Sequence, residues 1–230
     1  MRTPISVIRS EAEMGADSCR DTEHARELFS SIVEECVRLT SMTGQLLSLS
    51  REDARIGNAP NEPIILNAVV QEAILSLRPL ATTKRQELSL HVDAEPSLIV
   101  LADRQRLCQV FYNLIDNALK YTSPGGQITV TLTSCASEVI VEIVDNGVGI
   151  PAEHLPRIFN RFYRVKQGSG PDENGAGLGL SIVQSIVLSL GGRVAAESSP
   201  SEGSVFRVHL PVSRKQQLPT GSTPGPILDP

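Results

Sequence analysis

The sequence predicts an α+β fold in two parts: a helical hairpin over residues 1–56 and an α/β sandwich over residues 64–212. Apolar residues recur every three or four positions in the first part, as on an amphipathic helix. In the second part, alternating segments mix with helical ones without a regular strand–helix–strand repeat, which favours helices on one face of a mixed, largely antiparallel sheet. Residues 57–63, rich in Pro and Asn, form a linker between them.

The first part is expected to contain two helices. Pro4 suits the first turn of a helix whose apolar spacing continues to Ala12, and Gly15 breaks that pattern. A longer apolar stripe then runs from Leu28 to Leu49. Because two such helices present more apolar surface than they can cover, we expect a homodimer in which each hairpin forms half of a four-helix bundle. Packing of the hairpin on the chain's own second part is the alternative.

The second part is expected to alternate strands and helices, and each expected element follows from its apolar period and flanking turn residues. In order, these are a strand at 64–66, a helix at 67–84, strands at 87–92 and 98–101, a helix at 103–120, a hairpin of strands at 127–133 and 139–144, a short helix at 155–162, a Gly-rich segment at 166–179, a helix at 180–190, and strands at 193–197 and 205–210. Residues 213–230 are Pro-rich, and we expect a disordered tail.

Composition excludes several functional classes. The chain has 21 Lys and Arg against 26 Asp and Glu, a net charge of −5, and no basic block that could follow a phosphate backbone, so we expect no nucleic-acid binding. It has no apolar run long enough to span a membrane and no signal segment, so the chain is expected to be cytoplasmic without membrane contact of its own. Four cysteines at unrelated spacings indicate neither a disulfide framework nor a zinc site.

An acidic residue followed by two glycines, Asp145-Asn-Gly-Val-Gly-Ile150, comes directly after a predicted strand. A carboxylate only accepts hydrogen bonds, which suits the exocyclic amine of a purine, and Gly147 and Gly149 let the backbone approach a flat ligand. An ordinary Asp-Asn-Gly turn is the alternative. The stretch also matches a dinucleotide fingerprint, but the helix that this motif requires does not follow.

Three alternating glycines, Gly175, Gly177 and Gly179, precede an apolar helix. Free backbone N–H groups at a helix N-terminus, together with the positive end of its dipole, can bind phosphate oxygens. No Lys follows the glycines, so this is not the Walker-type phosphate loop. A plain glycine hinge is an equally good interpretation of this motif alone.

Two asparagines, Asn113 and Asn117, are four residues apart on a predicted helix and share one face. Mg²⁺ takes hard oxygen ligands and uses only one or two protein groups when phosphates are present. Lys120, on the same helix, is within reach of a phosphate. Solvated surface residues are the alternative for each of these side chains.

Together, the three motifs resemble those of the ATP-binding domain of sensor histidine kinases, in the superfamily that also holds type II topoisomerases, heat-shock chaperones and mismatch-repair ATPases. Asn113–Tyr121 is similar to the N box, Asp145–Gly149 to the G1 box, Phe159–Arg164 to the F box and Gly175–Gly179 to the G2 box. The resemblance implies that Asn113 and Asn117 hold Mg²⁺, that Tyr121 lines the base pocket, and that Asp145 binds the adenine amine.

The same resemblance implies a wider set of residues that contact ATP. These are Asn113, Asn117, Lys120, Tyr121, Asp145, Gly147, Gly149, Ile150, Phe162, Gly175, Gly177, Leu178, Gly179 and Leu180. Lys120 and Arg161 would contact the phosphates during catalysis. The hydrolytic members of the superfamily carry Glu four residues before the metal Asn. Position 113 holds an amide, which cannot serve as a general base, so ATP hydrolysis is not expected to be the main reaction.

Arg2-Thr3-Pro4-Ile5 resembles the end of the H box, which carries the phospho-accepting histidine in that family. Neither that histidine nor the acidic residue after it is in this chain. Thr3 matches the position that helps to dephosphorylate the response regulator. Because the likeness ends inside a motif, a fragment or a downstream start codon is favoured over a genuinely truncated protein.

The resulting hypothesis is the catalytic portion of a sensor histidine kinase, which moves the γ-phosphoryl of ATP to a histidine and then to an aspartate in the receiver domain of a response regulator. Its full-length parent is expected to be anchored in the bacterial inner membrane. Without the acceptor histidine, this chain is not expected to phosphorylate itself. Two alternatives remain: a non-catalytic Mg-ATP-binding dimerisation module, and an anti-sigma-type Ser/Thr kinase, against which the long hairpin counts.

Overall fold

The computed structural model describes residues 62–93, 99–135, 137–165 and 176–212, together with residues 8, 12, 26, 28–33 and 36. The described residues before position 62 are all helical, as their apolar spacing predicts. Most of the predicted hairpin, most of the linker and the Pro-rich tail lie outside the described residues. No helix within the described ranges is long and apolar enough to cross a membrane.

Eleven elements follow residue 61. They are β1 (Glu62–Ile65), α3 (Leu66–Thr83), β2 (Glu87–Asp93), β3 (Ile99–Ala102), α4 (Arg104–Tyr121), β4 (Gln127–Ser134), β5 (Glu138–Asp145), the 3-10 turn η1 (Leu155–Arg157), α5 (Gly179–Ser189), β6 (Arg193–Ser199) and β7 (Gly203–Pro211). Their order and type match the prediction from sequence except at one place.

The short helix predicted at 155–162 is wrong. Only the single turn η1 forms there, and the chain then turns at Phe162, whose φ of +63° lies in the left-handed region. The physical reason is a tertiary hydrogen bond, because the Phe162 N–H donates to the carbonyl of Gly177 at 2.8 Å. A continuous helix would direct that N–H back along its own axis.

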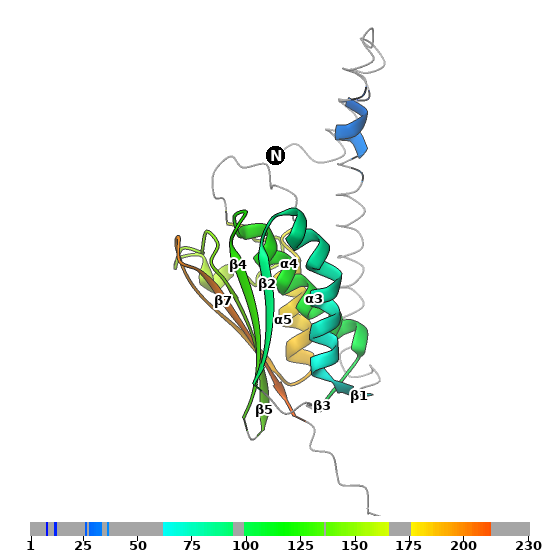
Figure 1. Ribbon diagram of the computed structural model, residues 1–230, viewed down its shortest axis with the longest axis vertical. Coiled ribbons are helices and arrows are strands. Elements are labelled where there is room, and N and C mark those ends of the chain that lie inside the picture. The colour runs from blue at the N-terminus through cyan, green and yellow to red at the C-terminus, as the bar shows by residue number, and fades with distance from the viewer. Residues whose placement is uncertain are drawn as a thin grey trace, which may run out of the picture.

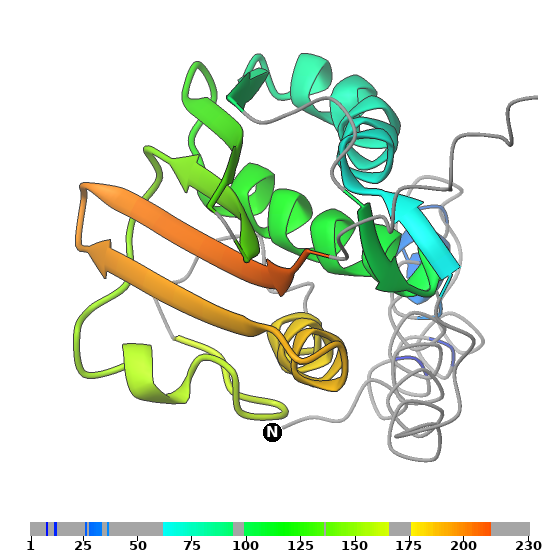
Figure 2. The same cartoon turned by 90° about the horizontal axis from the view of Figure 1, so that it is seen from below.

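Five strands form one sheet in the order β2-β4-β5-β7-β6. β2 and β4 are parallel and the other three pairs are antiparallel, which confirms the mixed, largely antiparallel sheet. Helices α3, α4 and α5 cover one face of this sheet (Figure 1). β1 and β3 form a separate antiparallel ribbon beside the first turns of α3 and α4 (Figure 2).

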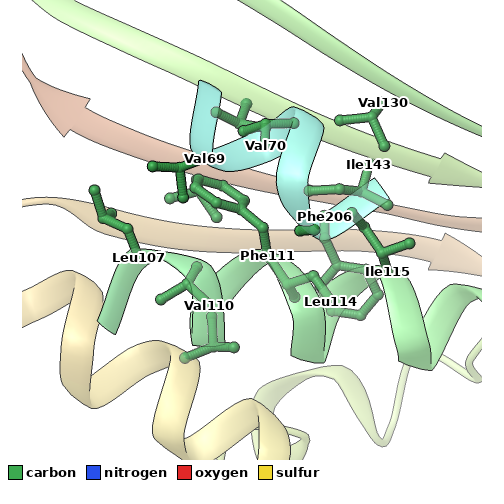
Figure 3. Close-up of a cluster of buried hydrophobic side chains, with 14 of the residues drawn as sticks. Val69, Val70, Leu107, Val110, Phe111, Leu114, Ile115, Val130, Ile143 and Phe206 are labelled. Atoms are coloured by element: carbon green, nitrogen blue, oxygen red, sulfur yellow. The ribbon is translucent and has the colours of Figure 1, made fainter. Parts of the chain in front are cut away.

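The core lies between the sheet and the three helices. Strand alternation in β5 directs Val139, Val141 and Ile143 toward the helices, and all three are fully buried. Helix α4 supplies Phe111 and neighbouring apolar side chains to the same layer (Figure 3). Asp145 is the next residue of the alternating set, so its carboxylate is placed on the helical face of the sheet, at the end of the strand.

On the opposite face of the sheet the described residues place no helix, and ion pairs run across it. Arg193 on β6 contacts both carboxylate oxygens of Glu138 on β5, at 2.5 and 2.9 Å. Arg207 on β7 contacts Glu142 at 2.6 Å and Glu197 at 2.7 Å. These pairs lie at the solvent-exposed surface, so water and salt screen them and they add little to the free energy of unfolding. Their main effect is to keep this face polar.

Candidate functional site

Helix α4 carries four of the predicted site residues, and both of its ends are fixed. At its start, the side chain of Asp103 accepts hydrogen bonds from the N–H groups of Gln105 and Arg106. At its end, the carbonyl of Leu119 accepts from Lys84 Nζ at 3.1 Å and from Gln86 Nε2 at 3.0 Å. Gln86 is buried, so the connection between α3 and β2 fixes the last turn of α4, where two of the predicted ligands lie.

The first asparagine of the pair touches the glycine at the start of α5. Asn113 Nδ2 donates to the carbonyl of Gly179 at 3.4 Å, and a Cβ added at Gly179 would lie 3.8 Å from Asn113 Cγ. Asn117 lies one turn further along α4 and is also half-buried. Because Asn113 uses its amide nitrogen here, its oxygen is the atom that suits a metal or another donor.

Lys120 forms an ion pair with Asp116, one turn earlier on α4, with 2.5 Å between Nζ and Oδ2. The lysine side chain is 40% exposed. Such a helical pair is worth about 0.3–0.5 kcal/mol, so an anionic ligand can compete for the ammonium group. Tyr121, the next residue, is half exposed at the end of the helix.

Asp145 is only 5% exposed at the end of β5. Its Oδ1 accepts a hydrogen bond from the N–H of Gly147 at 2.9 Å, and it also accepts from the backbone of Ser204 on the neighbouring strand. Burial raises the pKa of this carboxyl, and the two backbone hydrogen bonds oppose that rise. The group is therefore a fixed, nearly buried acceptor, as a site for an amine donor requires.

The glycines after Asp145 are fitted between α4 and β6. A Cβ at Gly147 would lie 2.3 Å from the carbonyl oxygen of Tyr121, so no larger residue fits. Gly149 has φ of +69°, and a Cβ there would lie 1.9 Å from the carbonyl oxygen of Ser199. The loop therefore contacts the end of α4 directly, which brings Asp145 and Tyr121 to one place.

Helix α5 begins at Gly179 without a side-chain cap. Its N-cap residue is Leu178, which is buried and supplies no hydrogen-bonding group. The N-cap side chain thus accepts no hydrogen bond from the first N–H groups of the helix, which lie beside Asn113. Gly177 has φ of +70°, and a Cβ there would lie 2.8 Å from the carbonyl carbon of Phe162.

The other predicted residues have more varied positions. Ile150 is half-buried and donates its N–H to Ser198 Oγ at 2.8 Å, and Leu180 packs at the edge of the core. Arg161 and Phe162 are exposed, the latter by 62%. Gly175 and Thr3 lie outside the described residues.

Two contributors to this geometry were missed. Gln86 supports the end of α4, but a single glutamine before a strand carries no sequence signal. Ser204 faces Asp145 across the β5–β7 pair. This contact follows from the register of the two strands, which the sequence does not specify. The arrangement as a whole joins Asn113 to Gly179, Tyr121 to Gly147, and Phe162 to Gly177.

A shallow hollow of about 310 Å³ lies elsewhere, between α3 and α4. It is lined by Glu72, Ala73, Ser76, Cys108, Gln109 and Tyr112, none of which is a predicted site residue. Burial, followed by the charge of Glu72, raises the pKa of the Cys108 thiol, which keeps it protonated and weakly reactive.

The residues present suit Mg²⁺ only as an ion shared with a ligand. Within the described ranges, no group of three or more His, Cys, Asp or Glu is close enough to hold a metal. Asn113 and Asn117 offer neutral amide oxygens, which match the one or two protein ligands that Mg²⁺ takes when phosphates complete its shell.

Comparison with known proteins is consistent with this geometry. Residues 1–55 match the His Kinase A (phospho-acceptor) domain, and residues 102–214 match the histidine kinase-, DNA gyrase B- and HSP90-like ATPase family. Sensor protein SrrB of Staphylococcus aureus (strain MRSA252) is 32% identical over 217 residues, or 92% of this chain. The chain spans 36% of the length of that relative.

Solved structures show the same likeness. Histidine kinase ThkA, in its complex with response regulator protein TrrA, has 25% identity and a TM-score of 0.74, covering 94% of this chain and 60% of that one. The mycobacterial sensor histidine kinase MprB has 27% identity and a TM-score of 0.58, covering 66% of this chain and 97% of that one.

Proposed function

Since the chain belongs to the sensor histidine kinase family, we propose that it is the Mg-ATP-binding, dimerising portion of a protein-histidine kinase. In the complete reaction, the γ-phosphoryl passes from ATP to a histidine on the helical hairpin and then to an aspartate in a response-regulator receiver domain. Residues 1–230 do not include that histidine, and their proposed part in the reaction is to bind and position the ATP from which the phosphoryl group is transferred.

One observation carries the nucleotide proposal. Helix α4 contacts the loop after Asp145 through Tyr121 and the start of α5 through Asn113, although the three come from separate stretches of sequence. In this arrangement, the Asp145 carboxylate accepts a hydrogen bond from the exocyclic amine of adenine, and Tyr121 lines the base pocket. The loop glycines, Gly147 and Gly149, let the loop pack directly against the backbone of Tyr121 and Ser199, which fixes the loop beside Asp145.

At the other end of the proposed site, the uncapped N–H groups of α5 face the phosphates. The Lys120 ammonium leaves its ion pair with Asp116 and contacts a phosphate oxygen instead, and Arg161 adds a second positive charge. Asn113 and Asn117 hold the magnesium ion through their amide oxygens. When bound, Mg²⁺ neutralises phosphate charge, and the chain's own contribution is positioning and electrostatic stabilisation. Position 113 lacks the carboxylate that would activate water, so hydrolysis is a minor reaction.

The proposed homodimer forms through the N-terminal hairpin. Phe29 and Val33 lie one turn apart on a helix and are 66% and 60% exposed in the single chain. Apolar side chains of this size at helical spacing are typical of a face that a second helix covers. Thr3, which lies outside the described residues, is proposed to assist dephosphorylation of the response regulator.

We keep the division of the chain into a hairpin at 1–56, a linker at 57–63, an ATP-binding domain at 64–212 and a tail at 213–230. Anchoring of a longer parent protein in the bacterial inner membrane also stays a prediction.

The test uses two purified proteins. The first is this chain, and the second is a copy extended at its N-terminus to complete the H box with His and Glu, carrying Asp145→Asn so that it does not bind ATP. With γ-labelled ATP, we expect no label on the first protein alone and an alkali-stable, acid-labile phosphohistidine on the second when both are mixed. The same copy with Gln in place of the added His is the control.

Other outcomes would contradict the proposal in distinct ways. Nucleotide binding without any transfer to the extended copy favours the non-catalytic dimerisation module. Acid-stable label on Ser or Thr favours the Ser/Thr kinase. Failure to bind an ATP analogue rejects the nucleotide site itself.

A further inference from the structure

A cluster of three side chains holds the segment between the two glycine loops. His154 Nδ1 lies 2.7 Å from the hydroxyl of Tyr163, and their ring centroids are 6.1 Å apart. The guanidinium of Arg157 lies over the Tyr163 ring, with Cζ 4.5 Å from the centroid. His154 and Tyr163 are half-buried. This stretch is built of turns, including η1, and the side-chain contacts join its start at His154 to its end at Tyr163.

The direction of the hydrogen bond follows from the other neighbour of the histidine. Glu153 Oε1 lies 3.5 Å from His154 Nε2, which favours the tautomer with its proton on Nε2. Nδ1 is then an acceptor, and the Tyr163 hydroxyl donates to it. Removing the hydroxyl alone therefore removes this bond and leaves the ring under Arg157 in place.

Tyr163 follows the one residue of this segment whose backbone is in the left-handed region. Phe162 has φ of +63°, a conformation that a bulky side chain adopts only when its surroundings hold it. Two hydrogen bonds do so: the Phe162 N–H donates to Gly177, and the Tyr163 N–H donates to the carbonyl of Asn160 at 3.2 Å. A fixed Tyr163 side chain limits rotation at this same point in the chain.

The contact from Phe162 continues to the phosphate end of the proposed site. Gly177, whose carbonyl accepts from Phe162, precedes Gly179 by two residues, and Gly179 starts α5 and accepts from Asn113. The base end is held separately, because Asp145 and Gly147 contact Tyr121 and Ser204. The Tyr163 cluster is thus linked to the phosphate end of the site through Phe162 and Gly177.

We propose that His154, together with Arg157, is a positioning residue for the triphosphate: by fixing Tyr163, it holds Phe162 and Gly177 so that the N-terminus of α5 faces the phosphates. This inference rests on the proposed nucleotide site. His154 does not touch the nucleotide, and its effect passes through the Tyr163 hydroxyl.

The test compares two ligands, a nucleotide and a nucleoside, in variants of the whole chain. His154→Ala and Tyr163→Phe remove the bond. His91→Ala and Tyr112→Phe remove the same groups from exposed positions on β2 and α4, outside the cluster. Dissociation constants are measured for a non-hydrolysable ATP analogue with Mg²⁺ and for adenosine, by competition with a fluorescent nucleotide. Melting temperatures without nucleotide are recorded for every variant.

We expect His154→Ala and Tyr163→Phe each to weaken the ATP analogue about three- to tenfold, as for loss of one hydrogen bond, with adenosine within about twofold. The double variant His154→Ala/Tyr163→Phe is expected to have the same dissociation constant for the ATP analogue as the single variant that binds it more weakly, since both substitutions remove the same hydrogen bond. His154→Gln, which keeps an acceptor, is expected to restore part of the affinity. Both control variants are expected to bind as the wild type does.

Equal weakening of adenosine and the ATP analogue would overturn the inference, because a general loss of structure moves both. Unchanged affinity in both cluster variants would overturn it as well. In either case a wild-type chain that binds ATP keeps the proposed function intact, whereas a wild-type chain that binds no ATP rejects both. Tyr163→Phe keeps the ring and decides the matter if His154→Ala is too unstable to measure.

Discussion

Asp145→Asn separates nucleotide recognition from folding, because the two side chains have nearly the same shape. In the proposed site, the carboxylate accepts a hydrogen bond from the adenine amine and also accepts hydrogen bonds from the backbone of Gly147 and Ser204. Asparagine keeps one acceptor oxygen and replaces the other with an NH₂ donor. If the amide oxygen of the new side chain still accepts from the Gly147 N–H, its NH₂ group faces the adenine amine, and two hydrogen-bond donors then oppose each other.

The expected loss of affinity has two parts. A hydrogen bond to a charged acceptor is worth about 1.5–3 kcal/mol, and a buried donor left without a partner costs about 1–3 kcal/mol more. The sum is about 3 kcal/mol or more, which corresponds to a rise of about a hundredfold or more in the Kd for ATP. Inosine triphosphate has a carbonyl oxygen in place of the amine, so the variant is expected to lose its preference for ATP over ITP.

The stability of the folded state is not expected to fall in the same variant. Burial raises the pKa of Asp145 in the folded state above its unfolded value. The contribution of such a group to stability is greatest below the unfolded pKa and declines as the pH rises through the folded pKa. Asparagine does not ionise, so at neutral pH the variant without nucleotide is expected to melt no lower than the wild type.

Two measurements decide this case. Calorimetric titration with ATP and ITP gives the affinities, and thermal unfolding without nucleotide gives the stability. A variant that binds ATP within about threefold of the wild type would refute the role assigned to the carboxylate. A variant that also melts well below the wild type would show that loss of binding reflects loss of structure.

Three further predictions test other parts of the site and its surroundings. Gly179→Ala adds a methyl 3.8 Å from Asn113 Cγ, an ordinary contact, and alanine is the better helix former, so we expect a melting temperature equal to or above that of the wild type but several-fold weaker Mg-ATP binding by calorimetry; equal affinity would contradict a phosphate site there. Lys120→Met gives up only the partly exposed pair with Asp116, about 0.3–0.5 kcal/mol, so thermal unfolding is expected to be unchanged while ATP binds more weakly and adenosine does not. Burial raises the pKa of Cys108, so iodoacetamide is expected to label it more slowly than the exposed Cys135 in peptide mass spectrometry, and equal rates would contradict this assignment.

The regular elements could be predicted from sequence because their apolar period records which face is buried. In β5 the alternation of Val139, Val141 and Ile143 predicts both the strand and the side on which Asp145 lies. The four-residue spacing of Asn113 and Asn117 likewise predicts one shared face of α4. These patterns are local, so the sequence contains them in full.

The segment around Phe162 could not be predicted because its conformation depends on partners far along the chain. The hydrogen bond to Gly177 joins residues 15 positions apart, and the apolar run at 155–162 is equally compatible with a short helix. The start of α5 shows the same limit, since Gly179 is helical although glycine is a poor helix former. The position of Gln86 depends on packing alone.

The polar outer face of the sheet limits how another molecule can approach this domain. A protein that covered it would have to remove water from Arg193, Arg207 and their carboxylate partners, and it would gain little apolar contact in return. Large exposed apolar side chains lie instead on the helices and the ribbon, at Leu75, Tyr112, Ile65 and Leu101. A protein that docks on this domain is therefore expected to approach its helical side, where apolar contact is available, and not the outer face of the sheet.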